Sequence, residues 1–396
     1  MYRLVPLALL ALAVATPAQA QLPAGFQAAW RKLTTAHQAA LRRAGIVGAT
    51  LAFVRDGRIV AADYYGMADL ATSRPVDGHT IYHWASITKT FTAVSVMELR
   101  DRHMLSLDDA IVTYVPELRK IYDPYGPVDA ITLRQLMSHS AGFRDPTWPW
   151  GGDEPWQPFE PTEWSQLVAM MPYTRLHFPP GSRFSYSNPG IIFLARALEQ
   201  VTGDVYEAYV DKNIFRVLDM RESYFDRTPW HLLPHRSNNY HVENGEPVAN
   251  GLDFNTGITV SNGGLNAPVS DLAKWLGFLM GRPADRRPQY DEVLSRPSLE
   301  EMWQEVVPTG EASPLGREGM GLCFFLYERD GHRIVGHTGT QASFRSFFLL
   351  DPDTGIGMIG VYNTAGGDAT APDTRGILDG IRRRVVEELF PLFWRD

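Results

Sequence analysis

Hydrophobic residues change from a helical to a strand spacing near the start of the chain. Residues 21–43 carry an apolar residue every three to four positions, which predicts an amphipathic helix. The runs 45–54 and 58–65 have the composition of β-strands. Asp56-Gly57 lies between these runs, and an Asp-Gly pair favours a tight turn, so this region is predicted to form a β-hairpin.

The clearest helical pattern covers residues 86–102. Ile87, Phe91, Val94 and Met97 follow a helical period there, and the stretch contains neither proline nor glycine. Further helices are predicted over 191–201, 270–280 (with Ser270 or Asp271 as N-cap) and 377–393, and strands over 321–329, 333–336, 343–350 and 355–362.

The order of these elements predicts two interleaved lobes. Helix and strands at the start of the chain match strands and helix at its end. We therefore expect an α/β lobe built from about 21–110 and 300–396, with a mainly helical lobe of about 111–299 inserted between them.

The first twenty residues form a separate segment. One arginine precedes a short apolar stretch, and Ala18-x-Ala20 resembles a signal peptidase site. The stretch is shorter than the ~20 residues that span a bilayer. We expect residues 1–20 to be a signal peptide, the mature protein to begin near Gln21 without a membrane span, and its location to be periplasmic or secreted. An uncleaved N-terminal anchor is the alternative.

Composition excludes several classes of protein. The formal charge of the 396-residue chain is 37 − 45 = −8, whereas a nucleic-acid-binding protein would present a basic face. A single cysteine excludes an intramolecular disulfide and any multi-cysteine metal site. Cys323 lies in an apolar run and is expected to be an inert buried thiol.

Three histidines, His231, His235 and His241, lie close together in sequence. Pro234 interrupts the helix that would direct the first two at one ion, and no carboxylate completes a zinc pattern. We interpret them as loop residues and expect neither a metal nor another cofactor.

The first candidate for chemistry is Ser86-Ile87-Thr88-Lys89, at the start of the clearest helix. Residues three apart share a helix face, so the hydroxyl of Ser86 and the amine of Lys89 can meet. A serine nucleophile needs such a base, and the helix N-terminus favours a developing oxyanion. Taken alone, the pattern more often marks an N-cap serine followed by a surface lysine.

Two further motifs can direct polar groups into a cleft. Tyr186-Ser187-Asn188 precedes a predicted helix, and a tyrosine near a lysine can relay protons. His337-Thr338-Gly339-Thr340 joins two predicted strands, where a glycine permits close backbone approach. Each has a structural alternative: a capping loop with Asn188 as N-cap, and a turn or bulge at a strand end.

In combination and in this order, the motifs resemble the serine β-lactamase and penicillin-binding protein family. The tyrosine of the second motif is similar to that of class C β-lactamases, DD-carboxypeptidases and related esterases. The resemblance covers nearly the whole chain after residue 20, through residues 86–89, 131–142, 186–188, 263–265 and 337–339. It implies a β-lactamase-like α/β fold, with an antiparallel sheet flanked by helices from both chain ends and an inserted helical lobe.

The resemblance also implies roles for individual residues. Ser86 would be acylated, while Lys89 and Tyr186 would move its proton. Asn188 would hold the substrate amide, and His337, Thr338 and Gly339 would border the substrate. The backbone amides of Ser86 and Thr340 would bind the oxyanion.

One position departs from the β-lactamase pattern, which usually has lysine where this chain has His337. A histidine is largely neutral at pH 7, so a substrate carboxylate would be attracted less strongly. Arg345 could supply a cation instead, although an exposed strand arginine is the alternative. Asn363 could also face the cleft. The Trp-rich stretch 143–164 either forms an apolar substrate wall or packs onto the helical lobe.

Together, these observations predict an exported serine hydrolase that forms a Ser86 acyl-enzyme with esters, amides or D-amino-acid peptides. A true class C-like β-lactamase is one alternative, and a non-catalytic penicillin-binding sensor is another. The expected partner is a small-molecule or peptide substrate, and the oligomeric state is left open.

Overall fold

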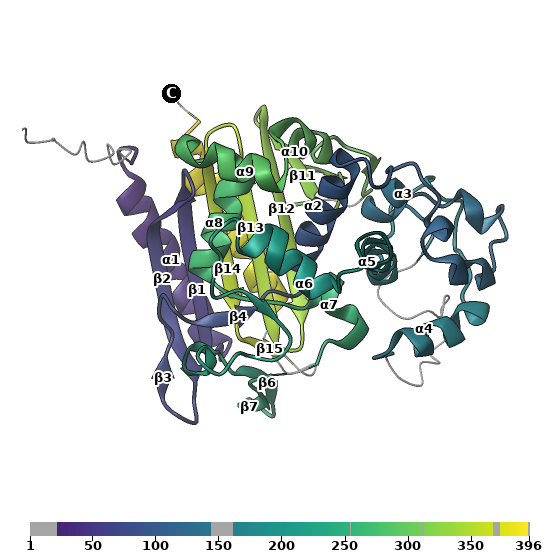
Figure 1. The fold of residues 1–396 in the computed structure, drawn as a ribbon. Helices are drawn as coiled ribbons and strands as arrows, with labels where there is room; N and C mark the ends of the chain where they lie inside the picture. The colour runs from purple at the N-terminus through teal and green to yellow at the C-terminus, as the bar shows by residue number, and fades with distance from the viewer. Residues whose placement is uncertain (1–21, 144–160, 254, 311–312, 367–372, 395–396) are drawn as a thin grey trace, which may run out of the picture.

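A nine-stranded antiparallel sheet forms the centre of the molecule (Figure 1). The computed structural model describes residues 22–143, 161–253, 255–310, 313–366 and 373–394, so the predicted signal peptide lies outside the described residues. The strand order is β3-β2-β1-β14-β13-β12-β11-β10-β9. These strands are β1 (Gly48–Arg55), β2 (Arg58–Asp69), β3 (Arg74–Pro75), β9 (Val307–Pro308), β10 (Arg317–Met320), β11 (Phe325–Arg329), β12 (His332–Gln341), β13 (Phe344–Asp351) and β14 (Ile356–Tyr362).

The sheet joins the two ends of the chain, as the sequence predicts. β1 pairs with β2 through the predicted hairpin, where Asp56 (φ 48°) and Gly57 (φ 72°) both adopt the left-handed conformation of a type I′ turn. β1 also pairs with β14, whose residues lie more than 300 positions later in the chain. The predicted antiparallel sheet built from both chain ends is therefore confirmed.

The remaining strands form two small sheets. One contains β4 (Ile81–His83), β8 (Leu265–Pro268) and β5 (Tyr224–Phe225). The other contains β15 (Thr364–Gly366), β6 (Asn239–Glu243) and β7 (Glu246–Gly251). The first matters for the site, because β4 leads directly into the Ser86 motif.

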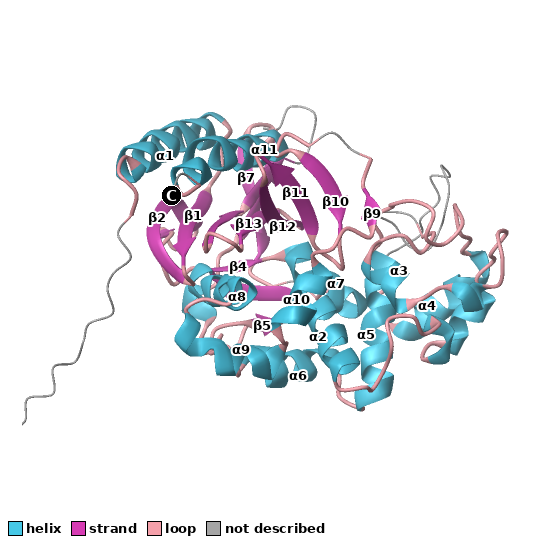
Figure 2. Ribbon diagram, turned by 90° about the horizontal axis from the view of Figure 1, so that it is seen from above, coloured by secondary structure: helices cyan, strands magenta, loops and turns pink. Residues whose placement is uncertain are grey.

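Helices cover both faces of the large sheet (Figure 2). The α-helices of the described residues are α1 (Phe26–Arg43), α2 (Thr88–Asp101), α3 (Leu133–Met137), α4 (Trp164–Met170), α5 (Asn188–Thr202), α6 (Tyr206–Val210), α7 (Val260–Gly263), α8 (Val269–Met280), α9 (Arg287–Val293), α10 (Arg296–Met302) and α11 (Thr374–Arg384). On one face α1 and α11 enclose a hydrophobic core with residues such as Phe53, Phe347 and Tyr362. On the other, α8 contacts β1, β2, β13 and β14.

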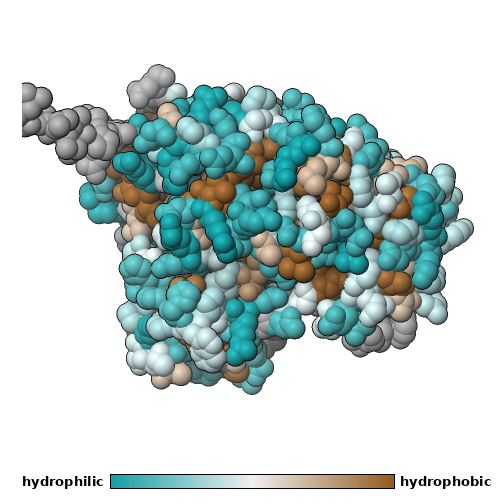
Figure 3. Space-filling model, in the orientation of Figure 1, coloured by the Kyte–Doolittle hydropathy of each residue, from teal (hydrophilic) through white to brown (hydrophobic). Residues whose placement is uncertain are grey.

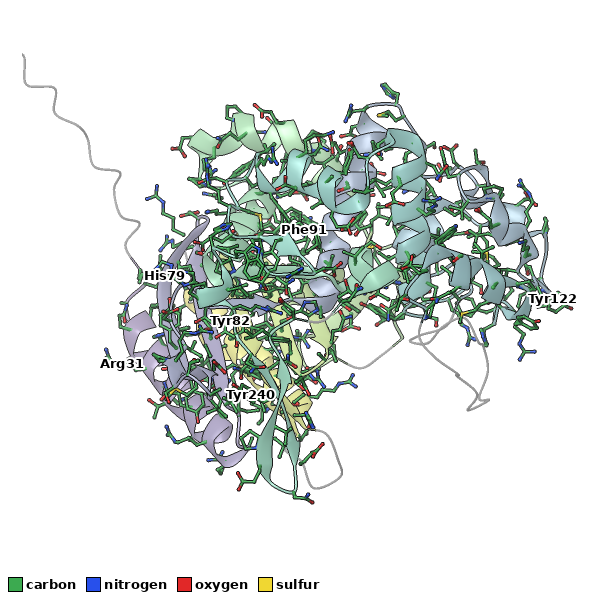
Figure 4. The ribbon with its side chains drawn as sticks, turned by 60° about the horizontal axis from the view of Figure 1, so that its bottom comes forward. Arg31, His79, Tyr82, Phe91, Tyr122 and Tyr240 are labelled. Carbon is green, nitrogen blue, oxygen red and sulfur yellow. The ribbon has the colours of Figure 1, made fainter. Side chains whose placement is uncertain are left out.

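Helix α2 lies between the sheet and the inserted helices. It contacts α5, α6, α7 and α10, and nearly all of its residues are buried. Phe91 on α2, which Figure 4 labels in the interior of the molecule, stacks on Trp275 of α8 with 3.8 Å between ring centroids. Burial on every side holds the beginning of α2 in a fixed place, which is where the Ser86 motif lies.

Several predicted details are corrected. The N-cap of α8 is Pro268, not Ser270 or Asp271, because the Asp271 carboxylate is buried and accepts from the Glu222 amide and the Ser223 hydroxyl. The final predicted helix is divided into α11, a π-helical turn (Val385–Leu389) and a 3₁₀ turn (Phe390–Leu392). Although α8 lies in the range predicted for the helical lobe, it packs on the sheet.

Cys323 interrupts the strand predicted over 321–329. Its φ of 60° separates β10 from β11, and its thiol is fully buried and donates to the Met137 carbonyl. Burial raises the pKa of this thiol to about 12, as expected for an inert cysteine.

The surface in Figure 3 is mostly hydrophilic, with separate hydrophobic patches between polar residues. No helix among the described residues is long and apolar enough to cross a membrane.

Candidate active site

Ser86 lies on a strained turn between β4 and α2. Ala85 has a φ of 50°, which is unusual for a residue with a side chain, and Ala85–Ile87 form a single 3₁₀ turn. The Trp84 amide donates to the Leu265 carbonyl at 2.8 Å, which ties this turn to β8. The turn leaves Ser86 partly exposed immediately before α2.

Lys89 lies one turn further along and is completely buried. Its Nζ is 2.9 Å from Ser86 Oγ and also donates to the backbone carbonyl of Asn262 at 2.8 Å. The predicted meeting of Ser86 and Lys89 is therefore present, and Lys89 is not a surface lysine. A hydrogen bond of this length provides a direct path for the serine proton.

Tyr186 approaches the same lysine from the start of α5. Lys89 Nζ lies 4.9 Å from the centroid of the Tyr186 ring. Ser187 is the N-cap of α5 and accepts from the Gly190 amide, so the cap is not Asn188. The Asn188 carbonyl accepts from the Asn262 side chain at 3.4 Å. A substrate-binding role for the Asn188 amide stays a prediction.

Strand β12 brings the third motif to the serine. β11 pairs with β12 only as far as Gly336, so the following residues have an edge facing the Ser86 turn. A Cβ at Gly339 would collide with the Trp84 carbonyl and the Ser346 hydroxyl. Gly339 thus permits the close approach of β12 to the turn that precedes Ser86, in agreement with the expected role of a glycine in this strand.

The His337 imidazole is buried beside Tyr186 and Phe325, at ring-centroid distances of 6.2 and 5.3 Å. Burial, together with the charge of Lys89, lowers the pKa of His337 to about 3. Its Nδ1 lies 2.6 Å from the Thr338 carbonyl, so Nδ1 carries the proton of the neutral ring. His337 is therefore a neutral group and does not replace the positive charge of a lysine.

Thr338 and Thr340 lie on the opposite side of β12 from His337 and Gly339, because side chains alternate along a strand. Thr340 pairs with Arg345, and Arg345 pairs with Tyr362 in the core under α1 and α11. Contact between Thr338 and substrate stays a prediction, as does the role of the Thr340 backbone amide in binding the oxyanion.

Arg345 does not supply the missing cation to this site. Its guanidinium donates to the Phe344 carbonyl at 2.8 Å, and burial and then the charge of Arg375 lower its pKa. Cross-strand partners share one face of a sheet, so Arg345 faces the α1 and α11 side. The prediction for Arg345 was wrong because the side of the sheet that it faces depends on the register between β13 and β14, which the sequence does not reveal.

Asn363 does not face the cleft either. It is fully buried; its Oδ1 accepts from the Gly48 amide at 2.7 Å, and its Nδ2 donates to the Met67 carbonyl at 3.0 Å. It therefore joins the ends of β1, β2 and β14.

Most of the Trp-rich stretch lies outside the described residues. Trp164 is described: it packs edge-on against Phe193 of α5 and under Arg196, which agrees with the packing alternative for this residue. Among the described residues, no group of three or more His, Cys, Asp or Glu is arranged to hold a metal ion.

Two contributors to the site were not assigned from the sequence. Asn262 acts through its backbone carbonyl, for which a residue type gives no signal. His139 stacks on Tyr186 with 4.4 Å between ring centroids. It falls within the stretch 131–142 that carries the family resemblance, and this was the available signal.

Known proteins resemble this chain over most of its length. The family described as Beta-lactamase matches residues 30–380. "Protein flp" of Staphylococcus aureus strain MW2 is 25% identical over 82% of this chain and 61% of its own length. The D-aminopeptidase of Brucella anthropi is 28% identical over 81% of this chain and 56% of its own length.

A similar solved structure is the octameric penicillin-binding protein homologue from Pyrococcus abyssi. It has a TM-score of 0.74 and 26% identity, over 91% of this chain and 78% of that one. The chain thus spans about three-fifths of the length of the curated relatives that it matches.

Proposed function

Because this chain belongs to the β-lactamase family of serine hydrolases, we propose that it hydrolyses esters, amides or D-amino-acid peptides through an acyl-enzyme on Ser86. The observation that carries the proposal is the 2.9 Å hydrogen bond between Ser86 Oγ and the Nζ of the fully buried Lys89. A surface lysine would be hydrated and mobile, whereas this one is held against the hydroxyl by the Asn262 carbonyl.

In the first step, Ser86 Oγ attacks the substrate carbonyl carbon, and its proton passes to the Lys89–Tyr186 pair. The carbonyl oxygen becomes negatively charged in the tetrahedral intermediate. The bond to the leaving alcohol or amine then breaks, and that group receives the proton through Tyr186. The products are an ester on Ser86 and the free leaving group.

The oxyanion would bind to the backbone amides of Ser86 and Thr340. The close approach of β12 at Gly339 supports this pairing, as does the position of Ser86 at the start of α2. Each amide is worth about 3–4 kcal/mol of transition-state stabilisation in comparable acyl-transfer enzymes.

In the second step, water replaces the leaving group. It attacks the Ser86 ester while the Lys89–Tyr186 pair accepts its proton, and that proton returns to Ser86 Oγ as the carboxylic acid leaves. The same groups serve both steps, and water is the only reactant besides the substrate.

The neutral His337 favours esters, amides and peptides over β-lactams. A β-lactam presents a carboxylate, and neither His337 nor Arg345 offers a positive charge to it. The partly buried ring of Phe325 lies beside Tyr186, and the ring of Phe184 packs against Phe325. These aromatic side chains suit an apolar acyl group. The D-aminopeptidase relative supports a D-peptide or D-amide within this class.

A panel of three substrates tests the proposal: a p-nitrophenyl ester, a D-Ala-D-Ala peptide and a chromogenic cephalosporin. We expect multiple turnovers of the ester or the peptide and much slower turnover of the cephalosporin. Ser86→Ala should abolish turnover. Ser95→Ala is the matched control, because Ser95 is a buried serine on α2, the helix that follows Ser86, and it donates to the Phe91 carbonyl.

Equal activity of Ser86→Ala and wild type would contradict the proposal. Acylation without turnover of any of the three compounds would instead identify a penicillin-binding sensor. Cephalosporin turnover faster than that of both other substrates would identify a β-lactamase.

Export is a separate part of the proposal, supported by the pattern of residues 1–20. The location that we propose is the periplasm or the outside of the cell. N-terminal sequencing of protein recovered there should begin at Gln21, whereas a chain that begins at Met1 would contradict cleavage.

A further inference from the structure

His139 is a buried histidine that the proposed acylation mechanism does not use. It contacts the Tyr186 ring and forms hydrogen bonds with the backbone on either side of that tyrosine. We propose that His139 is a positioning residue, which holds the Tyr186 phenol in the orientation that acylation of Ser86 requires. This proposal rests on the proposed function. It assigns His139 no contact with the substrate and no proton transfer.

The first observation is a pair of backbone contacts on either side of the tyrosine. The His139 carbonyl accepts from the Ser185 amide at 2.8 Å, and its Nδ1 accepts from the Ser187 amide at 3.1 Å. These two amides belong to the residues immediately before and after Tyr186. One histidine therefore fixes the main chain at both neighbours of the phenol.

The second observation is the ring contact. The imidazole lies nearly parallel to the phenol, with an interplanar angle of 28° and centroids 4.4 Å apart. The Phe325 ring, at 6.4 Å and 11°, is also nearly parallel to Tyr186. Such contacts restrict rotation of the phenol about its χ angles, in addition to the restraint on its backbone.

The third observation is the conformation of His139. It follows α3 and has a φ of 53°, a region that favours glycine or asparagine over residues with larger side chains. Glycine is the most frequent residue in this conformation after a helix, so a histidine here is consistent with a role for its side chain. Here that role is the combination of a ring and an acceptor.

The electrostatic state of His139 agrees with this role. Burial, followed by the charge of Lys89 and then by the neighbouring His337 ring, holds the pKa of His139 well below its usual value. In the neutral ring Nδ1 is the acceptor, so the proton is on Nε2, which has no hydrogen-bond partner among the described residues. The buried ring therefore keeps one nitrogen unsatisfied while the other bonds to the backbone of the Tyr186 segment.

Two substitutions test separately the contribution of the His139 ring and that of its hydrogen-bond acceptor, Nδ1. His139→Phe keeps a flat ring but leaves the Ser187 amide without its acceptor. His139→Asn tolerates the positive φ and can offer its Oδ1 to that amide, but it lacks the ring. Single-turnover acylation by a p-nitrophenyl ester, analysed for rate constant and KM separately, measures both.

We expect His139→Phe to lower the acylation rate constant by roughly 10- to 100-fold with little change in KM, since a small misplacement of a catalytic group has such an effect. His139→Asn should lose less than His139→Phe, because the backbone contact is restored. If His139→Phe does not fold, the comparison of His139→Asn with wild type carries the test.

A double-mutant cycle with Tyr186→Phe decides whether His139 acts through the tyrosine. If it does, His139→Asn and His139→Phe cause little additional loss when the Tyr186 hydroxyl is absent. Multiplicative losses would overturn the proposal, as would an acylation rate unchanged in both variants or a loss confined to KM. If Tyr186→Phe itself has no effect on acylation, the proposed function fails instead, so the two failures are distinguishable.

His37→Phe is the matched control. His37 is also a buried histidine beside a tyrosine, Tyr362, but it lies in the core under α1. This variant should lose stability and keep the wild-type acylation rate. A loss of acylation equal to that of His139→Phe would show that any buried histidine substitution has the effect, and would overturn the proposal.

Discussion

Two histidine–tyrosine pairs, each with a buried histidine, lie on opposite faces of the sheet and have different geometry. His37 Nε2 lies 2.7 Å from the hydroxyl of Tyr362, and the rings are tilted at 5.5 Å. His139 instead stacks on the face of Tyr186 at 4.4 Å and uses Nδ1 for the Ser187 backbone amide. In the first pair, the imidazole forms its hydrogen bond with the tyrosine hydroxyl. In the second pair, the imidazole accepts from a backbone amide next to the tyrosine.

The difference shows how the same residue types serve packing or chemistry. In the core pair, the tyrosine hydroxyl is satisfied by the imidazole, and burial raises the pKa of Tyr362 above its ordinary value. In the site pair, the histidine orients the tyrosine without binding its hydroxyl. Tyr186 is also partly exposed and next to Lys89, whereas Tyr362 is fully buried.

The largest expected difference is between the two tyrosines themselves. Tyr186→Phe should lower the acylation rate by about 10²- to 10⁴-fold, the usual contribution of a general acid–base group, with little effect on stability. Tyr362→Phe should leave the rate unchanged but lower the free energy of unfolding by about 1–3 kcal/mol, because His37 Nε2 loses its partner. Single-turnover kinetics and urea unfolding of both variants measure the contrast. Similar acylation rates in the two variants would remove the distinction between the pairs.

A smaller effect concerns pH and the core pair. Burial, with a contribution from Arg384, lowers the pKa of His37 to about 4, below its ordinary 6.5. As pH falls below 6.5 the unfolded chain gains the proton first, so stability is lost between about pH 6.5 and 4. The loss is about 1.4 kcal/mol per pH unit at most.

His37→Phe should therefore reduce the dependence of unfolding free energy on pH by about 2 kcal/mol between pH 7 and 5. Urea unfolding at the two pH values measures this. Parallel pH dependences in wild type and His37→Phe would show that His37 does not set this part of the stability.

The sequence was sufficient to predict the fold and the contact between Ser86 and Lys89, because the elements involved follow from local spacing. The Asp56-Gly57 hairpin follows from turn chemistry, and the contact of Ser86 with Lys89 follows from the helical period. The resemblance to a family then connected three motifs that lie far apart in the chain.

The remaining features depend on register and on backbone groups. Arg345 is adjacent to the third motif in sequence, but its pairing with Thr340 and Tyr362 places it on the other face of the sheet. The Asn262 carbonyl binds Lys89, and any residue type could supply that oxygen. The role of His139 depends on a left-handed backbone conformation and on pairing with residues about 48 positions away.

Covalent labelling of Ser86 is the most direct test of the central claim. The protein is treated with a fluorophosphonate, digested and analysed by mass spectrometry, with Ser86→Ala and Ser95→Ala treated in parallel. We expect one adduct on the peptide containing Ser86 in wild type and in Ser95→Ala, and none in Ser86→Ala. An adduct of equal yield in Ser86→Ala, or one mapped to a different serine, would contradict it.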